Sequence, residues 1–148
     1  MVRAYLRIMQ TRLGSRLQWS VTIPEELEDA AVPPGMLITL VENAIKHGIE
    51  PQPAGGRIDV TATREAHPDG ARIALSVVDT GAGLVGTPGV SGIGLANIRE
   101  RLALQYGERA VLETDANNPH GFIARFALPL DPVSVRAATT PLMESAAR

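Results

Sequence analysis

The sequence predicts an α+β domain in which helices lie on one face of a mixed sheet. Three segments repeat apolar residues at helical spacing, and several short segments alternate apolar and polar residues with a period of two. Along the chain these segments read helix, strand, helix, two strands, loop, helix, two strands. With 148 residues, 45% of them hydrophobic, the chain can bury one core rather than two. We therefore expect one domain.

The first predicted elements are a helix and a strand. Residues 2–13 repeat apolar side chains at helical spacing, and Gly14 is a natural helix stop. Residues 17–23 alternate, which is typical of a strand, and Pro24 ends the alternation. Trp19 belongs to the apolar set of this strand, so we expect it in the core.

The middle of the chain predicts a helix and a hairpin. The pair Pro33-Pro34 can open a helix, because the first N–H groups of a helix need no partner. We expect this helix over residues 34–47, closed at Gly48. Residues 57–65 and 71–79 alternate on either side of a polar turn, which predicts an antiparallel hairpin.

A glycine-rich loop separates this hairpin from the last elements. Residues 79–94 contain six glycines and one proline in sixteen positions, too flexible a composition for regular structure. A periodic helix over residues 93–107 follows, then strands over residues 110–115 and 121–130. The Ala-, Pro- and Thr-rich residues 131–148 have little to pack against, and we expect them to fray.

Composition excludes several classes of function. The formal net charge of −2 and pI near 5.9 predict no general attraction for nucleic acid or anionic lipid. The absence of cysteine excludes disulfides, thiolate metal sites and cysteine nucleophiles. The chain has neither a long apolar run nor a charged-then-apolar leader, so we expect a cytoplasmic piece without membrane contact. His67 and His120 lie in predicted turns, where we expect surface positions.

Three stretches carry polar groups in unusual places. In LVENAIKHG, Asn43 stands three residues from Lys46 and four from His47, so an α-helix places the three on one edge. In VVDTGAGL, a strand delivers Asp79 to the end of the sheet, followed by glycines that let a ligand approach the backbone. In SGIGLANIRER, Gly92 and Gly94 stand just before a helix N-terminus, whose free N–H groups and positive dipole end favour phosphate.

ENAIKHG, DTGAGL and GIGLANIRERL, in this order, resemble the N box and the two glycine boxes of the Bergerat-fold (GHKL) ATPases, which include sensor histidine kinases, gyrase and MutL. Within that superfamily, the chain is most similar to the ATP-binding catalytic domain of LytS-like sensor histidine kinases. The resemblance covers residues 4–130 and implies a two-layer α/β sandwich. It also implies that residues 1–15 end a dimerisation or linker helix and that residues 16–130 form the catalytic domain.

The resemblance implies ATP and Mg²⁺ as ligands. Asn43 would coordinate Mg²⁺ and Asp79 would accept a hydrogen bond from the adenine amino group, while Lys46 would face phosphate as a catalytic residue. The other residues implied to contact nucleotide are His47, Gly81, Gly83, Gly92, Gly94, Leu95, Asn97 and Arg99. Arg101 follows them and fits a phosphate contact, a solvent-facing position or an interdomain contact.

Glu42 is a second candidate catalytic residue. In gyrase-like relatives the water-activating Glu lies one turn before the Asn, where this chain has Thr39, so that role does not transfer directly. Glu42 is rotated about 100° from Asn43 on a helix. Contact with the phosphoacceptor His, contact with a metal-bound water and a role as base all stay open.

The implied function is presentation of the γ-phosphoryl group of Mg·ATP to a histidine on a dimerisation domain that these residues do not contain. The implied partners are ATP and ADP, that dimerisation domain in a homodimer, and a response regulator. The full-length kinase is compatible with a membrane anchor. Many relatives have Gly-Thr where this chain has Gly121-Phe122, which removes a hydroxyl. An anti-sigma-factor-type serine kinase and a non-catalytic nucleotide-sensing module are the alternatives.

Overall fold

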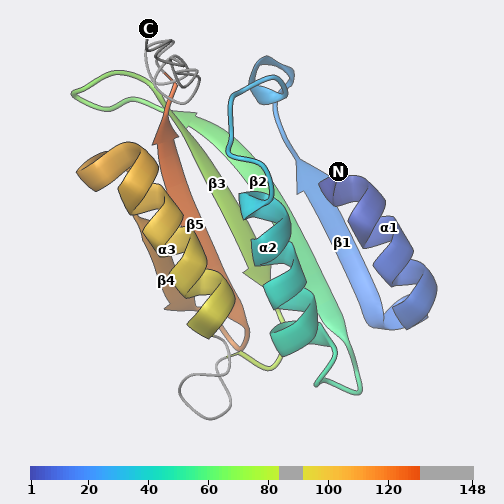
Figure 1. Ribbon diagram of the computed structural model, residues 1–148. Helices are drawn as coiled ribbons and strands as arrows, with labels where there is room; N and C mark the ends of the chain where they lie inside the picture. The colour runs from blue at the N-terminus through green and yellow to red at the C-terminus, as the bar shows by residue number, and fades with distance from the viewer. Residues whose placement is uncertain (84–91, 131–148) are drawn as a thin grey trace, which may run out of the picture.

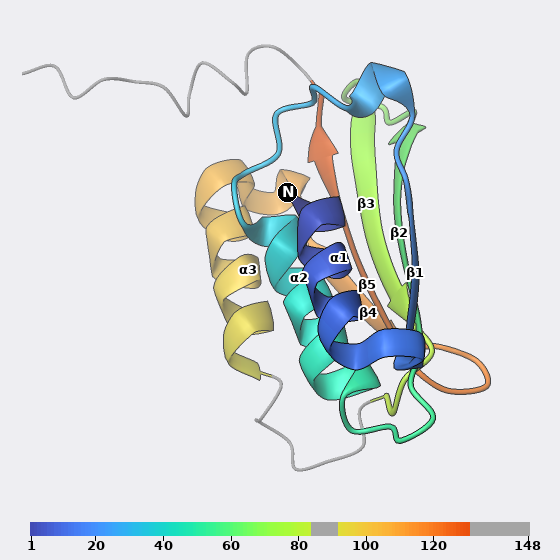
Figure 2. The same ribbon diagram turned by 90° about the vertical axis from the view of Figure 1, so that its right-hand side faces the viewer.

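A computed structural model describes residues 1–83 and 92–130, with side chains omitted at residues 92 and 93. In this part of the chain one mixed sheet has the strand order β1-β2-β3-β5-β4, and helices α1, α2 and α3 cover one of its faces (Figures 1 and 2). The strands are β1 Leu17–Thr22, β2 Gly56–Glu65, β3 Arg72–Asp79, β4 Leu112–Ala116 and β5 Phe122–Pro129, and the helices are α1 Val2–Leu13, α2 Met36–Asn43 and α3 Gly92–Tyr106.

The pairing of the strands confirms the predicted mixed sheet. β1 and β2 are parallel, and the chain between them crosses over the sheet through α2, as a parallel pair requires. The predicted hairpin is confirmed, since β2 and β3 are antiparallel, with Ile58 opposite Asp79 at its open end. The antiparallel partners β5 and β4 complete the sheet.

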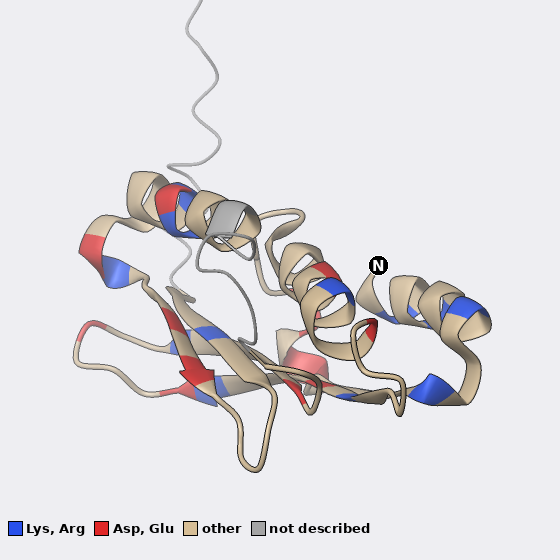
Figure 3. Cartoon of the chain, turned by 90° about the horizontal axis from the view of Figure 1, so that it is seen from below, with Lys and Arg blue, Asp and Glu red and all other residues tan. Residues whose placement is uncertain are grey.

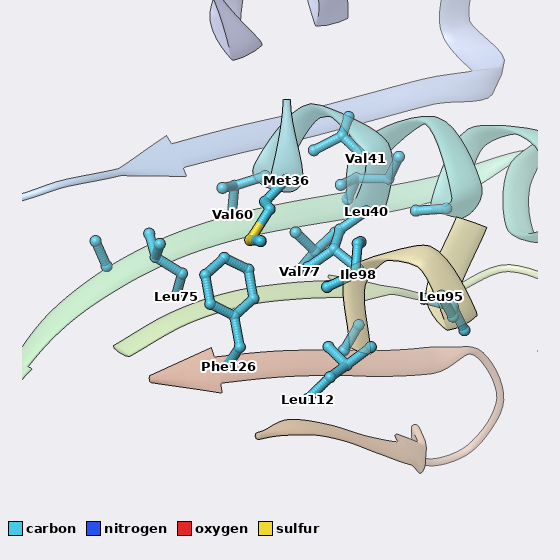
Figure 4. Close-up of a cluster of buried hydrophobic side chains, with 14 of the residues drawn as sticks. Met36, Leu40, Val41, Val60, Leu75, Val77, Leu95, Ile98, Leu112 and Phe126 are labelled. Atoms are coloured by element: carbon cyan, nitrogen blue, oxygen red, sulfur yellow. The ribbon is translucent and has the colours of Figure 1, made fainter. Parts of the chain in front are cut away.

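The apolar residues of alternate strand positions face the helices and form the core. Phe126 of β5 and Met36 of α2 are both fully buried, and Figure 4 shows the Phe126 ring pointing toward Met36. Ile98 and Leu102 of α3 are also fully buried, as their helical spacing predicts. Each such burial is worth about 1.5–3 kcal/mol against exposure, so core packing determines which face of the sheet the helices cover.

α1 lies beside β1 at one edge of the layer of helices (Figure 2). It buries Leu6 and Met9 and ends at Gly14, which has a φ of 59°. The predicted core position of Trp19 is confirmed only in part. The indole packs against the core at intermediate exposure, and its Nε1 donates a hydrogen bond to Gln10 Oε1 of α1 at 3.2 Å.

The predicted bounds of the middle helix are wrong at both ends. The helix starts at Met36, after Gly35 with a φ of 83°, so Pro33 and Pro34 precede it. At the other end it continues as a π-helical turn, η3 Ala44–Ile49, so Gly48 lies inside the helical run instead of ending it. Buried apolar side chains on this turn hold it against the sheet, which is why the chain continues past the glycine.

The remaining short helical turns connect the larger elements. These turns are η1 Gly14–Arg16, η2 Glu25–Leu27 and η4 Gly107–Arg109. In the described residues, no helix combines the length and the apolar character that crossing a membrane requires. The predicted loop of residues 79–94 is described at residues 79–83 and 92–94, and its end was predicted wrongly, since Gly92 already begins α3. The predicted fraying of residues 131–148 lies outside the described residues.

Candidate functional site

Asp79 ends β3 at the lower end of the molecule in Figure 1, and it is the one buried charged residue in the described part of the chain, at 2% exposure. Its Oδ1 accepts a hydrogen bond from the Gly81 N–H at 2.9 Å. Burial raises the pKa of the Asp79 carboxyl, while the N–H groups of Gly81 and Phe122 and the charge of His120 act in the opposite direction. A carboxylate kept in so costly a position is a candidate functional residue.

Glycines surround Asp79 because side chains would not fit there. A Cβ on Gly48 would lie 2.8 Å from Asp79 Oδ1, and a Cβ on Gly81 would lie 2.1 Å from Gly48 O. Gly121 has a φ of +117°, and a Cβ there would lie 1.9 Å from Asp79 O. Gly48, predicted as a helix stop, is therefore needed for the close approach of η3 to the end of β3.

The turn after Asp79 is hydrogen-bonded to η3. The Ala82 N–H donates to Gly48 O at 2.9 Å, and Gly83 has a φ of 73°, a left-handed conformation that favours glycine. The predicted N box and first glycine box, thirty residues apart in the sequence, thus meet at one end of the sheet. The main chain of η3 at Gly48 therefore lies against the turn that follows the buried carboxylate.

The predicted polar edge of the middle helix spans two kinds of helix. Asn43 is the last residue of α2, whereas Lys46 and His47 belong to the π-helical turn. The α-helical spacing that the prediction assumed therefore holds only up to Asn43. Asn43 and His47 are half-buried and Lys46 is exposed, so all three can be reached by a ligand at this end of the domain.

Glu42 and Thr39 face different neighbours of α2. Burial raises the pKa of the Tyr5 phenol, and the charge of Glu42 raises it further, so Glu42 lies near α1. A Cβ on Gly94 of α3 would lie 3.4 Å from Thr39 Cγ2, so Thr39 lies beside α3. Because α1 and α3 flank α2 on opposite sides (Figure 2), Glu42 and Thr39 are on different sides of the helix.

The second glycine box begins α3 at the same end of the molecule (Figure 1). Leu95 is buried in the core, a role that the prediction of a nucleotide contact did not include, while Asn97 and Arg99 are exposed. Arg101 donates a hydrogen bond from Nη2 to Pro34 O at 3.1 Å, which ties α3 to the segment before α2. Figure 3, which views the domain from below, shows basic and acidic residues interspersed.

One oxygen ligand from the protein suits Mg²⁺ bound with a nucleotide. Within the described residues, no group of three or more His, Cys, Asp or Glu could hold a metal ion by itself. Mg²⁺ commonly keeps several waters and takes its other ligands from phosphates. The amide oxygen of Asn43 is a hard donor of the kind this ion takes, so the residues present fit a metal that arrives with its nucleotide.

Sequence reasoning missed two residues of this site. Asn117, in the turn between β4 and β5, donates from Nδ2 to Asp79 O at 2.9 Å. His120 is exposed, as predicted, but its Nδ1 lies 3.0 Å from Gly81 O. Neither residue has a periodic or motif signal, and only their place just before Gly121 distinguishes them in the sequence.

Comparison with known proteins identifies the class to which this fold and site belong. Residues 35–132 match the model of the histidine kinase-, DNA gyrase B- and HSP90-like ATPases, and the chain belongs to this family. It is 35% identical over 119 residues to the sensor histidine kinase BtsS of Escherichia coli, an alignment that covers 78% of this chain and 20% of that protein. The chain thus spans about a fifth of the length of the curated relatives it matches.

Other relatives and solved structures agree with this assignment. Sensor histidine kinase YesM of Bacillus subtilis is 32% identical over 126 residues, covering 81% of this chain and 21% of that protein. The histidine kinase domain of an Erythrobacter litoralis blue-light-activated histidine kinase superposes with a TM-score of 0.59 at 18% identity, covering 93% of this chain and 65% of that chain. The catalytic domain of histidine kinase ThkA superposes with a TM-score of 0.64 at 16% identity, covering 88% of this chain and 92% of that chain.

These findings confirm the predicted fold class and the predicted family. The mixed sheet with helices on one face is the fold of histidine kinase catalytic domains. The relatives reported above are sensor histidine kinases, and membership of this ATPase family supports ATP as the nucleotide. The roles of single residues stay predictions.

Proposed function

We propose that this chain is the ATP-binding catalytic domain of a sensor histidine kinase, which presents the γ-phosphoryl group of Mg·ATP to a histidine on a dimerisation domain outside these residues. The observation that carries the proposal is the buried carboxylate of Asp79, held by the Gly81 N–H at the end of β3. The family and the kinase relatives support it.

Asp79 recognises the base in this proposal. One carboxylate oxygen already accepts the Gly81 N–H, and the carboxylate retains acceptor sites for the exocyclic amino group of adenine. Guanine presents a carbonyl oxygen at the equivalent position, so it would meet the carboxylate as a second acceptor and be rejected. Gly48, Gly81 and Gly83 keep the floor of the pocket free of side chains.

Residues on α2, η3 and α3 bind the phosphates in this proposal. Asn43 holds Mg²⁺, which when bound neutralises charge on the phosphates. Lys46 and His47 lie one turn further along the helix, and Gly92 and Gly94 bring the N–H groups of the α3 N-terminus toward phosphate. Asn97 and Arg99 complete the proposed set from the exposed side of α3.

Catalysis would then rest on positioning and charge neutralisation. The lone pair of the acceptor imidazole nitrogen attacks the γ-phosphorus, the bond to the bridging oxygen breaks, and ADP leaves. A base that activates water would waste the phosphoryl group. Thr39 occupies the place of the water-activating Glu, and Glu42 lies near Tyr5 on the other side of α2, so neither is assigned that role.

The proposal extends to the whole protein of which this chain covers a part. Residues 1–15 would end the helix that leads from the dimerisation domain, residues 16–130 would form the catalytic domain, and the intact kinase would act as a homodimer on a response regulator. The alternatives predicted from the sequence, a serine kinase and a nucleotide-sensing module, gain no support from relatives described as sensor histidine kinases.

Calorimetric titration tests the proposal. Wild-type protein and Asp79→Asn are titrated with ATP, ADP and GTP, with and without Mg²⁺. We expect adenine-selective binding, strengthened by Mg²⁺ and weakened by about 10- to 150-fold in Asp79→Asn, because a hydrogen bond to a charged group is worth about 1.5–3 kcal/mol. Asp69→Asn, in the exposed turn at the other end of β3, is the matched control and should bind like wild type.

Two outcomes would contradict the proposed site. If wild-type protein binds no ATP, the proposed nucleotide site is wrong. If Asp79→Asn binds ATP as tightly as wild type, the role assigned to Asp79 is wrong. If ATP binds as expected, incubation with a LytS-like dimerisation domain and labelled ATP separates a kinase from a sensing module. A kinase transfers the label to a histidine of the supplied domain, and a sensing module does not.

A further inference from the structure

We propose that Asn117 and His120 are positioning residues that hold the Asp79 carboxylate for adenine recognition, an inference that rests on the proposed function. Both residues lie in the turn between β4 and β5, which reaches the end of the sheet where β3 ends (Figure 1). Their side chains contact the main chain of Asp79 and Gly81 rather than any predicted ligand group.

Asn117 joins this turn to the last residue of β3. Its Nδ2 donates to Asp79 O at 2.9 Å. Its Oδ1 accepts from the Asn118 N–H at 2.9 Å, and its own N–H donates to Gly121 O at 3.1 Å. The side-chain amide is thus held at both ends, so its bond to the carbonyl of Asp79 has a defined direction.

His120 fixes the next peptide units. Its Nδ1 lies 3.0 Å from Gly81 O, and since a carbonyl can only accept, Nδ1 carries a proton and donates. The N–H of the same glycine donates to Asp79 Oδ1. His120 therefore acts on the carboxylate through Gly81, whose C=O accepts from His120 and whose N–H donates to Asp79.

Close packing transmits any shift of the turn to the carboxylate. A Cβ on Gly121 would lie 1.9 Å from Asp79 O, and a Cβ on Gly83 would lie 3.2 Å from Gly121 O, so the two backbones lie in direct contact. Because these backbones are in contact, a shift of the turn by about an ångström would also displace Asp79. A displacement of that size is enough to weaken ligand recognition.

Strand pairing alone does not hold this part of the chain. The pairing of β3 with β5 ends at Asp79 opposite Phe122. Beyond it, Thr80 N donates to Arg57 O at 3.0 Å and Ala82 N donates to Gly48 O at 2.9 Å, which holds the turn from the side of β2 and η3. Asn117 and His120 hold it from the opposite side, that of β5.

The test compares ATP with purine riboside triphosphate, which lacks the exocyclic amino group. In ATP this group would donate a hydrogen bond to Asp79. The affinities of both are measured by calorimetry with Mg²⁺ for wild type, Asn117→Ala, His120→Ala, His120→Asn and the control Asn118→Ala. Asn118 is a neighbouring exposed residue that offers only its main-chain N–H to the bonds above.

We expect Asn117→Ala and His120→Ala to weaken ATP binding by about threefold to tenfold, the effect of losing one hydrogen bond. Binding of purine riboside triphosphate should change less, because the amino group that depends on the carboxylate is absent. His120→Asn should restore ATP binding, since its Nδ2 replaces the Nδ1 donor. Asn118→Ala should match wild type for both nucleotides.

The outcomes separate this inference from the proposed function. Wild-type protein that binds no ATP overturns both. A second result overturns the positioning role alone. In this case ATP binding depends on Asp79, but Asn117→Ala and His120→Ala lose the same affinity for ATP and for purine riboside triphosphate, or lose none. Thermal melts of each variant without nucleotide show that it is folded at the temperature of the titration.

Discussion

The proposed nucleotide site has a base side, formed around Asp79, and a phosphate side, formed by Asn43, Lys46 and Arg99. The two sides differ in solvent exposure and in how tightly their residues are packed. On the base side, Asp79 is 2% exposed, and its carboxylate and carbonyl both accept hydrogen bonds from neighbouring residues. On the phosphate side, Lys46 and Arg99 are exposed to solvent and Asn43 is half-buried. One side is packed against backbone, and the other presents side chains to water.

This difference follows from the cost of burying each kind of group. A carboxylate that selects one hydrogen-bond donor of its ligand must be shielded from water before the ligand binds. Fixed N–H groups of the protein offset the cost of this desolvation. Cations that bind phosphate keep their hydration until phosphate and Mg²⁺ replace it. We therefore expect rigid geometry to matter most for the base, and charge to matter most for the phosphates.

Filling the space beside Asp79 should have the largest effect. Gly48→Ala places a Cβ 2.8 Å from Asp79 Oδ1, so ATP binding should fall by more than about 100-fold and stability by about 1–3 kcal/mol, as overpacking costs. Calorimetry and thermal melts measure the two. Gly14→Ala, strained at a φ of +59° but with no atom within 4 Å of its Cβ, should lose stability while retaining ATP affinity.

A retained affinity in Gly48→Ala would mean that the base pocket tolerates displacement. The packed base side would then be no more demanding than the exposed phosphate side, and the contrast between the two would be wrong.

Removing the metal contact should have a smaller effect, confined to ligands with phosphates. Asn43→Ala, or chelation of Mg²⁺ from wild type, should weaken ATP binding by about tenfold, the loss of one charged contact. Adenosine, which needs only the base side, should bind equally well to wild type and variant. Calorimetric titration with both ligands measures this.

Equal losses for ATP and adenosine in Asn43→Ala would place Asn43 in the base pocket or in the structural core. If chelation further weakens ATP binding to Asn43→Ala as much as it does in wild type, a different residue holds the metal.

The smallest expected effect is a pH dependence of stability that originates at Asp79. Burial raises the pKa of this carboxyl in the folded protein, so its contribution to stability is complete below the unfolded value of about 3.9 and is lost as pH rises through the folded value. Asp79→Asn has no such loss. Without nucleotide, the variant should therefore gain stability relative to wild type as pH rises from about 4 to 7.

Thermal melts of both proteins across this pH range measure the difference. A wild type that instead gains stability over Asp79→Asn with rising pH would show that the N–H groups of Gly81 and Phe122 outweigh the cost of burial. The base side would then be stable without its ligand.

Sequence patterns predicted most of the fold and the family. Alternation predicted the strands of the hairpin, and helical spacing predicted α1 and α3. Three glycine- and polar-rich stretches carried the resemblance to the family and the residues of the proposed site. The prediction failed at Gly48, because a glycine at a helix end and a glycine under a carboxylate look identical in sequence. It did not include the contacts of Asn117 and His120, whose partners lie 38 and 39 residues away along the chain.

Local chemistry therefore determined, from the sequence alone, the kinds of elements, their order and the polar groups they carry. Propensity and periodicity depend on near neighbours in the chain, and these are visible in sequence. The tertiary structure alone decided that α2 continues through a π-helical turn, that Gly48 adjoins Asp79, and that the turn after β4 contacts the main chain of Asp79 and Gly81. These features depend on which distant backbones come into contact, and packing against the sheet determines that.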